Sequence, residues 1–304
     1  MIVRTPNPQE ELLGSGSFGT VFRLQGLPIA RKYIRLPQSG GGLPPEGIRE
    51  IACLRRLRNY SPSDRRNCID VLHIEISKTN IMLDLELMTG GTLGELLSEA
   101  RLGPELALSY SVQILRGLQF LHDVGITHRD LKPNNILLSS PNGLKIADFG
   151  LSHVISGCEP RTPLVCTLYY RPPELLRANV FLNKVRGLTY TSAIDNWSAG
   201  CILREMIVGL GPVFRPARTI YSSTTSSIEQ LDAIIKKFYL SSGFINEKLA
   251  TSFCNSTLKL PEITISPPLM NQILEVTQLL LIPNPEFRCA AGTALKTLEQ
   301  LDST

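Results

Sequence analysis

A short polar segment near the middle of the chain carries the side chains best suited to chemistry. Residues 128–135 read His-Arg-Asp-Leu-Lys-Pro-Asn-Asn. The Asp130 carboxylate can accept the proton of a hydroxyl group, and the Lys132 ammonium can neutralise a migrating phosphoryl group. The Asn135 side chain offers Mg²⁺ an oxygen ligand. Because the segment follows a long helical pattern, we expect it to form a loop.

A second acidic motif, Asp-Phe-Gly, follows at residues 148–150. Asp148 lies eighteen residues after Asp130 (148 − 130 = 18), and two short apolar runs, 135–138 and 144–147, lie between them as a predicted hairpin. Asp148 can bridge Mg²⁺ to phosphate oxygens. An Asp-Phe-Gly triplet alone can arise by chance, but both motifs in this order indicate phosphoryl transfer.

A glycine-rich segment near the N-terminus is suited to holding phosphates. Residues 14–19 read Gly-Ser-Gly-Ser-Phe-Gly and continue into the apolar run 21–24. Because a strand follows, the glycines lie in a β-turn and not at the helix start that dinucleotide-binding folds use. Without Cβ atoms, backbone N–H groups in this turn can close over phosphate oxygens. For the motif alone, a glycine-rich hairpin without a ligand is the alternative.

Two further charged residues are candidates for orienting phosphate. Lys32 lies in the apolar run 29–34, eighteen residues after Gly14 (32 − 14 = 18). A buried lone ammonium is costly, so Lys32 needs a partner. Glu50 lies eighteen residues further on (50 − 32 = 18) in a predicted helix and can supply an ion pair. From these residues alone, two unrelated surface charges are the alternative.

The elements that must position these residues change character near residue 88. Residues 1–88 predict short strands around one helix, which Pro44, Pro45 and Glu46 open with the residue types that helix starts favour. The apolar side of this helix is predicted from four residues: Ile48, Ile51, Ala52 and Leu54.

Helices dominate the rest of the chain. A long helix is predicted from Pro104 to Gly125, and later helices are predicted over 191–208, 228–240, 269–281 and 290–301. Three intervening segments are predicted to be irregular insertions or long loops: 177–190, 211–227 and 241–268. The pattern therefore predicts a strand-rich part followed by a larger helical part.

The composition is that of an ordinary globular protein. Apolar residues make up 43% of the 304 residues and charged residues 19%, and the formal net charge is +4. This charge is too small to argue for a nucleic acid partner. No apolar run of about 20 residues predicts a membrane span. Seven cysteines without a Cys-x-x-Cys pair predict reduced thiols in a cytoplasmic or nuclear protein.

Taken together, the glycine-rich segment and the two aspartate motifs resemble the signature set of the protein kinases. The resemblance extends from Leu13 to Arg288. It implies an α+β, bilobal protein kinase fold, with a small antiparallel β-sheet and one main helix in an N-lobe (1–88) and a mostly helical C-lobe (89–304). It also implies a buried structural ion pair between Glu174 and Arg288.

The resemblance implies a serine/threonine kinase that uses ATP and Mg²⁺. The catalytic residues would be Asp130, Lys132, Lys32 and Glu50, and the metal ligands Asn135 and Asp148. The adenine would lie between the lobes against hinge backbone. The implied ATP-binding residues are Leu13, Gly14, Ser15, Gly16, Ser17, Phe18, Gly19, Val21, Ala30, Lys32, Glu86, Met88 and Leu137.

A narrower resemblance is to the cyclin-dependent kinases. Residues 44–50, Pro-Pro-Glu-Gly-Ile-Arg-Glu, resemble the PSTAIRE helix of that branch, and 167–171 and 197–202 resemble two of its other signatures. This likeness implies protein substrates with Ser-Pro or Thr-Pro sites, read by a pocket that contains Cys166. It also implies a cyclin-like activator docked on the helix that carries Glu50.

The same resemblance predicts sites of regulation. Thr162 would be the target of an activating kinase, and Arg49 and Arg129 would bind its phosphate. His153 stands where the cyclin-dependent kinases have a third arginine. Phe18 replaces an inhibitory tyrosine, so an inhibitory phosphate in this segment would fall on Ser15 or Ser17.

Two alternative functions remain at this point. A relative of the MAP kinases is one, although residues 159–164 contain no Thr-x-Tyr. A pseudokinase that acts as a scaffold is the other. Pseudokinases typically lack the phosphate-binding lysine, the catalytic aspartate or the magnesium aspartate, and this chain has all three as Lys32, Asp130 and Asp148.

Overall fold

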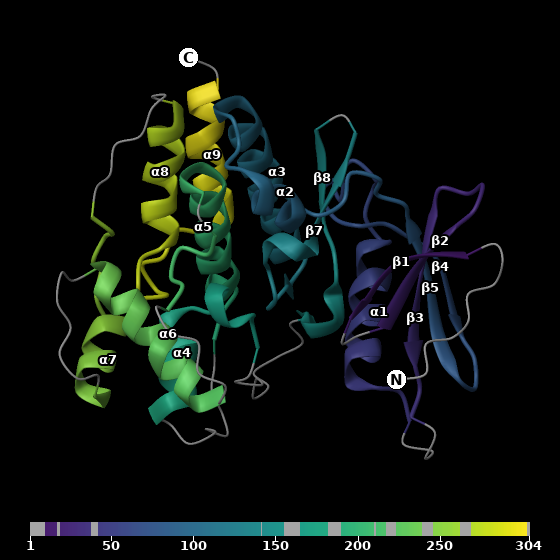
Figure 1. Cartoon of the computed structure of the whole chain (residues 1–304), viewed down its shortest axis with the longest axis horizontal. Helices are drawn as coiled ribbons and strands as arrows, with labels where there is room; N and C mark the ends of the chain where they lie inside the picture. The colour runs from purple at the N-terminus through teal and green to yellow at the C-terminus, as the bar shows by residue number, and fades with distance from the viewer. Residues whose placement is uncertain are drawn as a thin grey trace.

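The structure is a computed structural model. It describes residues 10–16, 19–37, 42–140, 142–154, 165–181, 190–209, 211–216, 223–238, 246–261 and 269–302. A sheet with one helix beside it forms the smaller part of the molecule, and helices form the larger part (Figure 1). This arrangement confirms the expected α+β fold with two unequal lobes.

The smaller lobe is built on an antiparallel sheet of strand order β1-β2-β3-β5-β4. Its strands are β1 (Glu10–Gly16), β2 (Gly19–Leu24), β3 (Ile29–Arg35), β4 (Val71–Ile76) and β5 (Asn80–Glu86). The register pairs Gly14 with Val21 and Val21 with Lys32, so these three residues lie in one row across β1, β2 and β3. The sheet therefore brings the glycine-rich segment alongside the lysine.

Helix α1 (Pro45–Leu57) begins at the predicted prolines, with Pro44 as its N-cap residue. The expected apolar side is partly wrong, because Ile48 is 50% exposed and Ala52 is also exposed. The buried side consists of Gly47, Glu50, Ile51, Cys53, Leu54 and Leu57. Positions 47, 50, 51 and 54 follow the i, i+3, i+4, i+7 period of one helix face, but a glycine and a glutamate hide that period from an apolar count.

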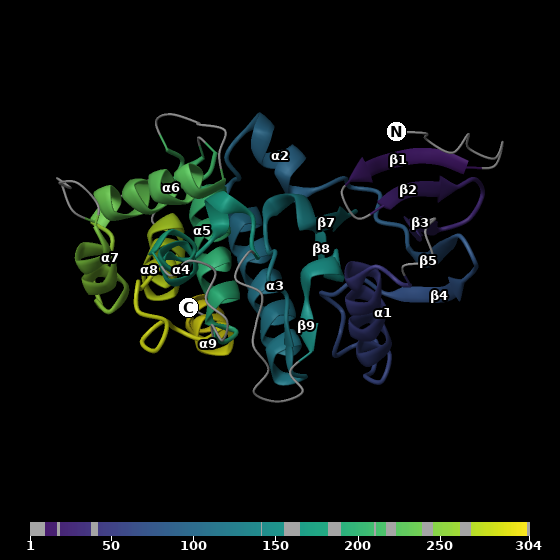
Figure 2. The same ribbon diagram turned by 90° about the horizontal axis from the view of Figure 1, so that it is seen from below.

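The larger lobe contains eight α-helices among the described residues. They are α2 (Leu93–Glu99), α3 (Pro104–Asp123), α4 (Pro173–Phe181), α5 (Ala193–Val208), α6 (Ser223–Phe238), α7 (Glu247–Cys254), α8 (Leu269–Leu280) and α9 (Ala291–Asp302). Two small sheets face the other lobe: β6 (Ile126–Thr127) pairs with β9 (His153–Val154), and β7 (Ile136–Ser139) pairs with β8 (Gly143–Ile146). Figure 2 shows α1 beside β9, at the junction of the lobes.

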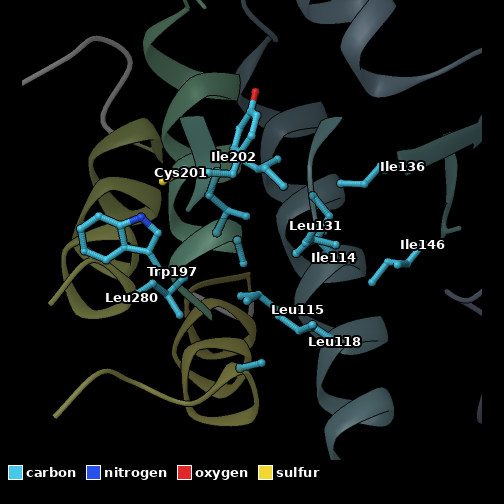
Figure 3. Packing of buried hydrophobic residues seen from close by; sticks show 14 of the residues in the cluster. Ile114, Leu115, Leu118, Leu131, Ile136, Ile146, Trp197, Cys201, Ile202 and Leu280 are labelled. Carbon is cyan, nitrogen blue, oxygen red and sulfur yellow. The ribbon is translucent and has the colours of Figure 1, made fainter. Parts of the chain in front are cut away.

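Helix α5 forms the centre of the larger lobe. Every residue from Ala193 to Ile207 is buried, and the indole of Trp197 is fully enclosed. Side chains of α3, such as Ile114 and Leu118, and of α8, such as Leu280, complete this core (Figure 3). The candidate catalytic segment 128–135 lies beside this core, since Leu131 and the adjoining Ile136 are members of the same cluster.

Three predictions of irregular structure are wrong in part. Helix α4 extends to Phe181 within 177–190, α6 begins at Ser223 within 211–227, and α7 lies within 241–268. Helix α7 is short but has an N-cap, because the Asn246 side chain accepts a hydrogen bond from the Leu249 N–H. Helix α6 was predicted over 228–240 and begins earlier than expected, whereas α4 and α7 have nine and eight residues and are too short to give a long apolar period.

Two observations concern the chain as a whole. Among the described residues, no helix has both the length and the apolar character that a membrane span requires. The six cysteines in the described part form no disulfide. Burial raises the pKa of the Cys53 and Cys68 thiols to about 12, so these two side chains are unreactive at neutral pH.

Candidate active site

Asp130 lies in the loop between β6 and β7, and its side chain accepts hydrogen bonds from four donors. Its Oδ1 accepts hydrogen bonds from the Thr167 hydroxyl (2.7 Å) and the Thr167 N–H (2.8 Å). Its Oδ2 accepts bonds from Lys132 Nζ (2.7 Å) and Asn135 Nδ2 (3.2 Å). Asp130, Lys132 and Asn135 therefore lie together, as predicted, and Thr167 joins them from a distant part of the chain.

The backbone of the same loop is strained and is held by a buried carboxylate. Arg129 has φ 68°, in the left-handed region that non-glycine residues rarely adopt. Asp195 on α5 accepts hydrogen bonds from the His128 N–H (2.7 Å), the Arg129 N–H (2.8 Å) and His122 Nε2 (3.1 Å). Burial alone would raise the pKa of Asp195, but the hydrogen bond from His122 and the charges nearby outweigh it and lower the pKa. Asp195 therefore remains ionised and fixes the loop.

A second cluster forms around Lys32. Its Nζ lies 2.7 and 2.9 Å from the two carboxylate oxygens of Glu50 on α1, and 3.1 Å from Asp148 Oδ1. Lys32 is 7% exposed and Glu50 is 2% exposed. Burial alone would lower the pKa of Lys32, but the charges of Glu50 and Asp148 outweigh it and raise the pKa. Burial raises the pKa of Glu50 despite the opposing charge of Lys32, and the predicted ion pair is present and buried.

The two candidate metal ligands lie on either side of the predicted hairpin. Asp148 has φ 65°, a second strained position, and its side chain is 27% exposed. Burial alone would raise the pKa of Asp148, but Lys32 outweighs it and lowers the pKa. Asn135 Nδ2 donates hydrogen bonds to Asp130, which fixes the orientation of the Asn135 side-chain amide. The Asn135 Oδ1 atom has no hydrogen bond in the described part of the chain. Both residues thus present oxygen atoms.

The glycine-rich segment contributes to the end of β1 and the start of β2, and its Ser17 and Phe18 lie outside the described residues. Gly14, Ser15 and Gly16 lie on β1, where Ser15 pairs with Thr20 of β2. Gly19 requires glycine, because a Cβ there would lie 2.3 Å from the Tyr33 carbonyl oxygen.

The remaining candidate nucleotide contacts lie on both lobes. Leu13 is half exposed on β1, and Ala30 is buried opposite Leu85 in the pairing of β3 with β5. Leu137 lies on β7. After β5, the Met88 N–H donates to no acceptor among the described residues. This N–H is therefore available to donate a hydrogen bond to the edge of an adenine ring.

The two arginines expected to bind a phosphate converge on one turn. Arg49 Nε donates to the Gly150 carbonyl (3.0 Å), and Arg129 Nε donates to the Leu151 carbonyl (2.6 Å). Thr162, whose phosphate they were predicted to bind, lies outside the described residues. The Arg49 and Arg129 guanidinium groups therefore lie near each other, and the phosphorylation of Thr162 stays a prediction.

Sequence reasoning overlooked two residues of this site. Thr167 appeared only as part of a likeness, although both its hydroxyl and its N–H bind Asp130. Asp195 has no assigned role in the sequence motifs above, although it accepts hydrogen bonds from the backbone N–H groups of His128 and Arg129 in the Asp130 loop. Neither interaction follows from spacing, since Thr167 lies 37 residues and Asp195 66 residues from its partner. By contrast, the predicted Glu174–Arg288 ion pair is present at 2.8 Å.

Comparison with known proteins identifies a matching family and several similar proteins. Residues 8–297 match the family described as the protein kinase domain. CTD kinase subunit alpha of Schizosaccharomyces pombe is 36% identical over 214 residues, which are 67% of this chain and 34% of that protein. Cyclin-dependent kinase 4 of Ovis aries and that of Mus musculus are each 36% identical over 207 residues, 64% of this chain and 65% of each relative. The chain thus spans less than two thirds of the length of these relatives.

Proposed function

The chain belongs to the protein kinase family, and we propose that it is a serine/threonine kinase that transfers the γ-phosphate of ATP to another protein. The observation that carries the proposal is the assembly of two clusters, one around Asp130 and one around Lys32, from five separate segments of the chain. Magnesium-dependent phosphoryl transfer to a peptide hydroxyl, lost in Asp130→Asn, tests it.

ATP and Mg²⁺ fit the groups that the site presents. Mg²⁺ is commonly bound by one or two protein ligands together with substrate phosphates. The Asp148 carboxylate and Asn135 Oδ1 are two such ligands. No group of three or more His, Cys, Asp or Glu residues in the described ranges is placed to hold a metal ion by itself. This agrees with a site that ATP completes, with Lys32 beside its phosphates.

The chemistry follows from positioning. Bound ATP would supply the phosphoryl group, and Mg²⁺ held by Asp148 and Asn135 would neutralise charge on its oxygens. Asp130, fixed by Thr167, orients the acceptor hydroxyl and takes its proton, while Lys132 stabilises charge on the moving group. Because the transition state of phosphoryl transfer is loose, most of the rate comes from placement and electrostatics rather than from covalent catalysis.

We also propose that the acceptor residue is followed by proline. The support is the backbone at Cys166, which has φ 65°, and whose carbonyl accepts hydrogen bonds from Arg171 Nε (3.2 Å) and Nη2 (2.8 Å). A carbonyl held in this way is unable to accept a bond from the N–H of the residue after the acceptor. Proline has no N–H to leave unsatisfied.

A degenerate peptide library should show this preference. Proline after the acceptor serine should be enriched about tenfold, because burying an unsatisfied N–H costs about 1–3 kcal/mol. Arg171→Met should weaken the enrichment, since methionine has no N–H to donate to the Cys166 carbonyl and leaves it free to accept a bond. A library without proline enrichment in the wild type would contradict the proposal.

A cyclin-like activator is proposed to dock on α1. Ile48 is 50% exposed on this helix while Glu50, two residues on, binds Lys32, so a partner that covers Ile48 also fixes the ion pair. Leu72, on the edge strand β4, is a second large apolar side chain of this lobe that is exposed, at 45%. Reversing a 1:99 population of the inward helix takes about 5.5 kcal/mol of differential binding.

The expected result is low turnover of the chain alone and stimulation by a cyclin-like protein. Ile48→Asp should remove the stimulation because it places a charge in the apolar interface. Phe287→Asp is the matched control, since Phe287 is 61% exposed on the larger lobe, away from α1. Full activity of the isolated monomer, or equal stimulation of both variants, would overturn the proposal.

Activation through Thr162 belongs to the same proposal. Arg49 and Arg129 are the groups that would bind its phosphate, and both already contact the turn after Asp148. A phosphate there would connect α1, the catalytic loop and the magnesium ligand. The pseudokinase alternative is less well supported, because Lys32 and Asp130 each have the partners that turnover requires.

A further inference from the structure

The loop after α1 exposes a serine followed by proline. The sequence contains five Ser-Pro or Thr-Pro pairs, which begin at Thr5, Ser61, Ser140, Thr162 and Ser266. Ser61-Pro62 is the pair of which the structure describes both residues, and both are exposed. This dipeptide is the kind of site that the proposed specificity recognises, and it lies outside the active site.

The Ser61 hydroxyl organises its own loop. Its Oγ donates to Asp64 Oδ2 (2.6 Å) and accepts a hydrogen bond from the Asp64 N–H (3.2 Å). Ser63 is equally exposed and lies 2.8 Å from it, Oγ to Oγ, but is followed by aspartate. A phosphate on Ser61 would remove the donated bond and repel the Asp64 carboxylate.

Arg65 contacts the backbone on both sides of the Tyr60–Ser61 peptide bond, since its own N–H donates to the Ser61 carbonyl (3.3 Å). Its Nε donates to the carbonyl of Tyr60 (3.2 Å), the residue directly before Ser61. Its Nη1 forms an ion pair with Asp70, and the two side chains are 13% and 27% exposed. A phosphate dianion is a stronger partner for a guanidinium than a single carboxylate. Phosphate and Asp70 would therefore compete for Arg65.

Asp70 connects this loop to the hinge. Its N–H donates to Glu86 Oε1 (2.7 Å), and its carbonyl accepts a bond from the Glu86 N–H (3.1 Å). Glu86 Oε1 also lies 2.6 Å from Lys145 Nζ, on β8 of the larger lobe. Continuous contacts thus extend from the exposed Ser61 to the residue that begins the predicted adenine-binding hinge.

We propose that Ser61 is a phosphorylation site for proline-directed kinases, and that its phosphate draws Arg65 from Asp70 and loosens the hinge. In the modification, the Ser61 Oγ–phosphorus bond forms while the bond from the γ-phosphorus of ATP to the β–γ bridging oxygen breaks. ADP leaves, and the hydroxyl proton passes through the modifying kinase's base to water. The inference rests on the proposed function only for its readout, which is nucleotide affinity.

The first experiment locates the modification. The Asp130→Asn chain, which cannot modify itself, is incubated with ATP and an unrelated proline-directed kinase, and phosphopeptides are mapped by mass spectrometry. Phosphate should appear on Ser61. It should be absent in Ser61→Ala and Pro62→Ala and retained in the matched control Ser63→Ala. Absence of phosphate from Ser61, or its persistence in Pro62→Ala, overturns the proposal.

The second experiment measures the consequence by titrating ADP into the same chain before and after phosphorylation. The Kd should rise about fivefold, at the low end of the range for coupling between two sites. Phosphorylated Ser61→Ala should show no rise, which excludes the other Ser-Pro and Thr-Pro sites. Arg65→Gln should bind ADP with the weakened Kd before modification and show no further change after it, whereas Arg65→Lys should behave like the parent chain.

The outcomes separate the inference from the proposed function. Equal Kd values for the unmodified and Ser61-phosphorylated chains overturn the inference alone. Failure of the unmodified chain to bind ADP at all contradicts the proposed function, and phosphate mapping then still decides whether Ser61 is a site.

Discussion

Asp130→Asn should lower kcat by a factor of about 10³, within the range that general acid–base residues contribute. The amide keeps the shape of the carboxylate, and its oxygen can still accept the bonds from Thr167. In the variant, however, the NH₂ group faces two donors, Lys132 Nζ and Asn135 Nδ2, which bind Asp130 Oδ2 in the wild type. The side chain therefore loses its base and its fixed orientation together.

Steady-state kinetics with saturating ATP and the activator measures this effect. The KM for ATP should change little, because Asp130 is not among the predicted ATP contacts. Asp123→Asn makes the same chemical change on an exposed carboxylate at the end of α3 and should leave kcat unchanged. A kcat for Asp130→Asn within tenfold of the wild type would remove Asp130 from the mechanism.

Arg288→Met should lower the free energy of unfolding by about 3–5 kcal/mol, the cost typical of breaking a buried ion pair from one side. The guanidinium donates to both carboxylate oxygens of Glu174 (2.8 and 2.9 Å) and to the carbonyls of Ile282, Ala193 and Pro283. It also lies 5.1 Å from the ring centre of Trp197. Methionine fills much of the volume but satisfies none of these acceptors.

Urea unfolding followed by Trp197 fluorescence measures the loss. Arg116→Met is the matched control, because it breaks the exposed Arg116–Glu299 pair, for which a loss below about 1 kcal/mol is typical. Adding Glu174→Gln to Arg288→Met should recover part of the stability by removing the uncompensated charge. Equal losses of unfolding free energy in Arg288→Met and Arg116→Met would show that the buried pair stabilises the fold no more than the exposed pair.

Much of the site was predictable because its residues lie close together in sequence. Residues 128–135 supply Asp130, Lys132 and Asn135 within one loop, and the Asp-Phe-Gly motif follows after a recognisable hairpin. The Lys32–Glu50 pair was also predictable, because a lysine inside an apolar strand demands a partner. For these residues, the residue type and the spacing in the sequence are sufficient to predict a place in the candidate site.

Other contacts depend on how distant elements pack. The bonds of Thr167 to Asp130 and of Asp195 to the Arg129 N–H join segments that only the fold brings together. The outward position of Ile48 was hidden for a different reason: Gly47 and Glu50 occupy the buried side of α1, and neither is apolar. Charged side chains of a helix usually face solvent. Glu50 is buried instead because it pairs with Lys32.

Transfer of labelled γ-phosphate from ATP to a Ser-Pro peptide tests the central claim most directly. The wild-type chain and Asp130→Asn are compared at equal concentration, with Mg²⁺ and with excess EDTA. The account predicts labelled phosphoserine from the wild type with Mg²⁺, at a rate far above that of Asp130→Asn, and none with EDTA. Equal labelling by the two chains in Mg²⁺, with or without a cyclin-like activator, would contradict it.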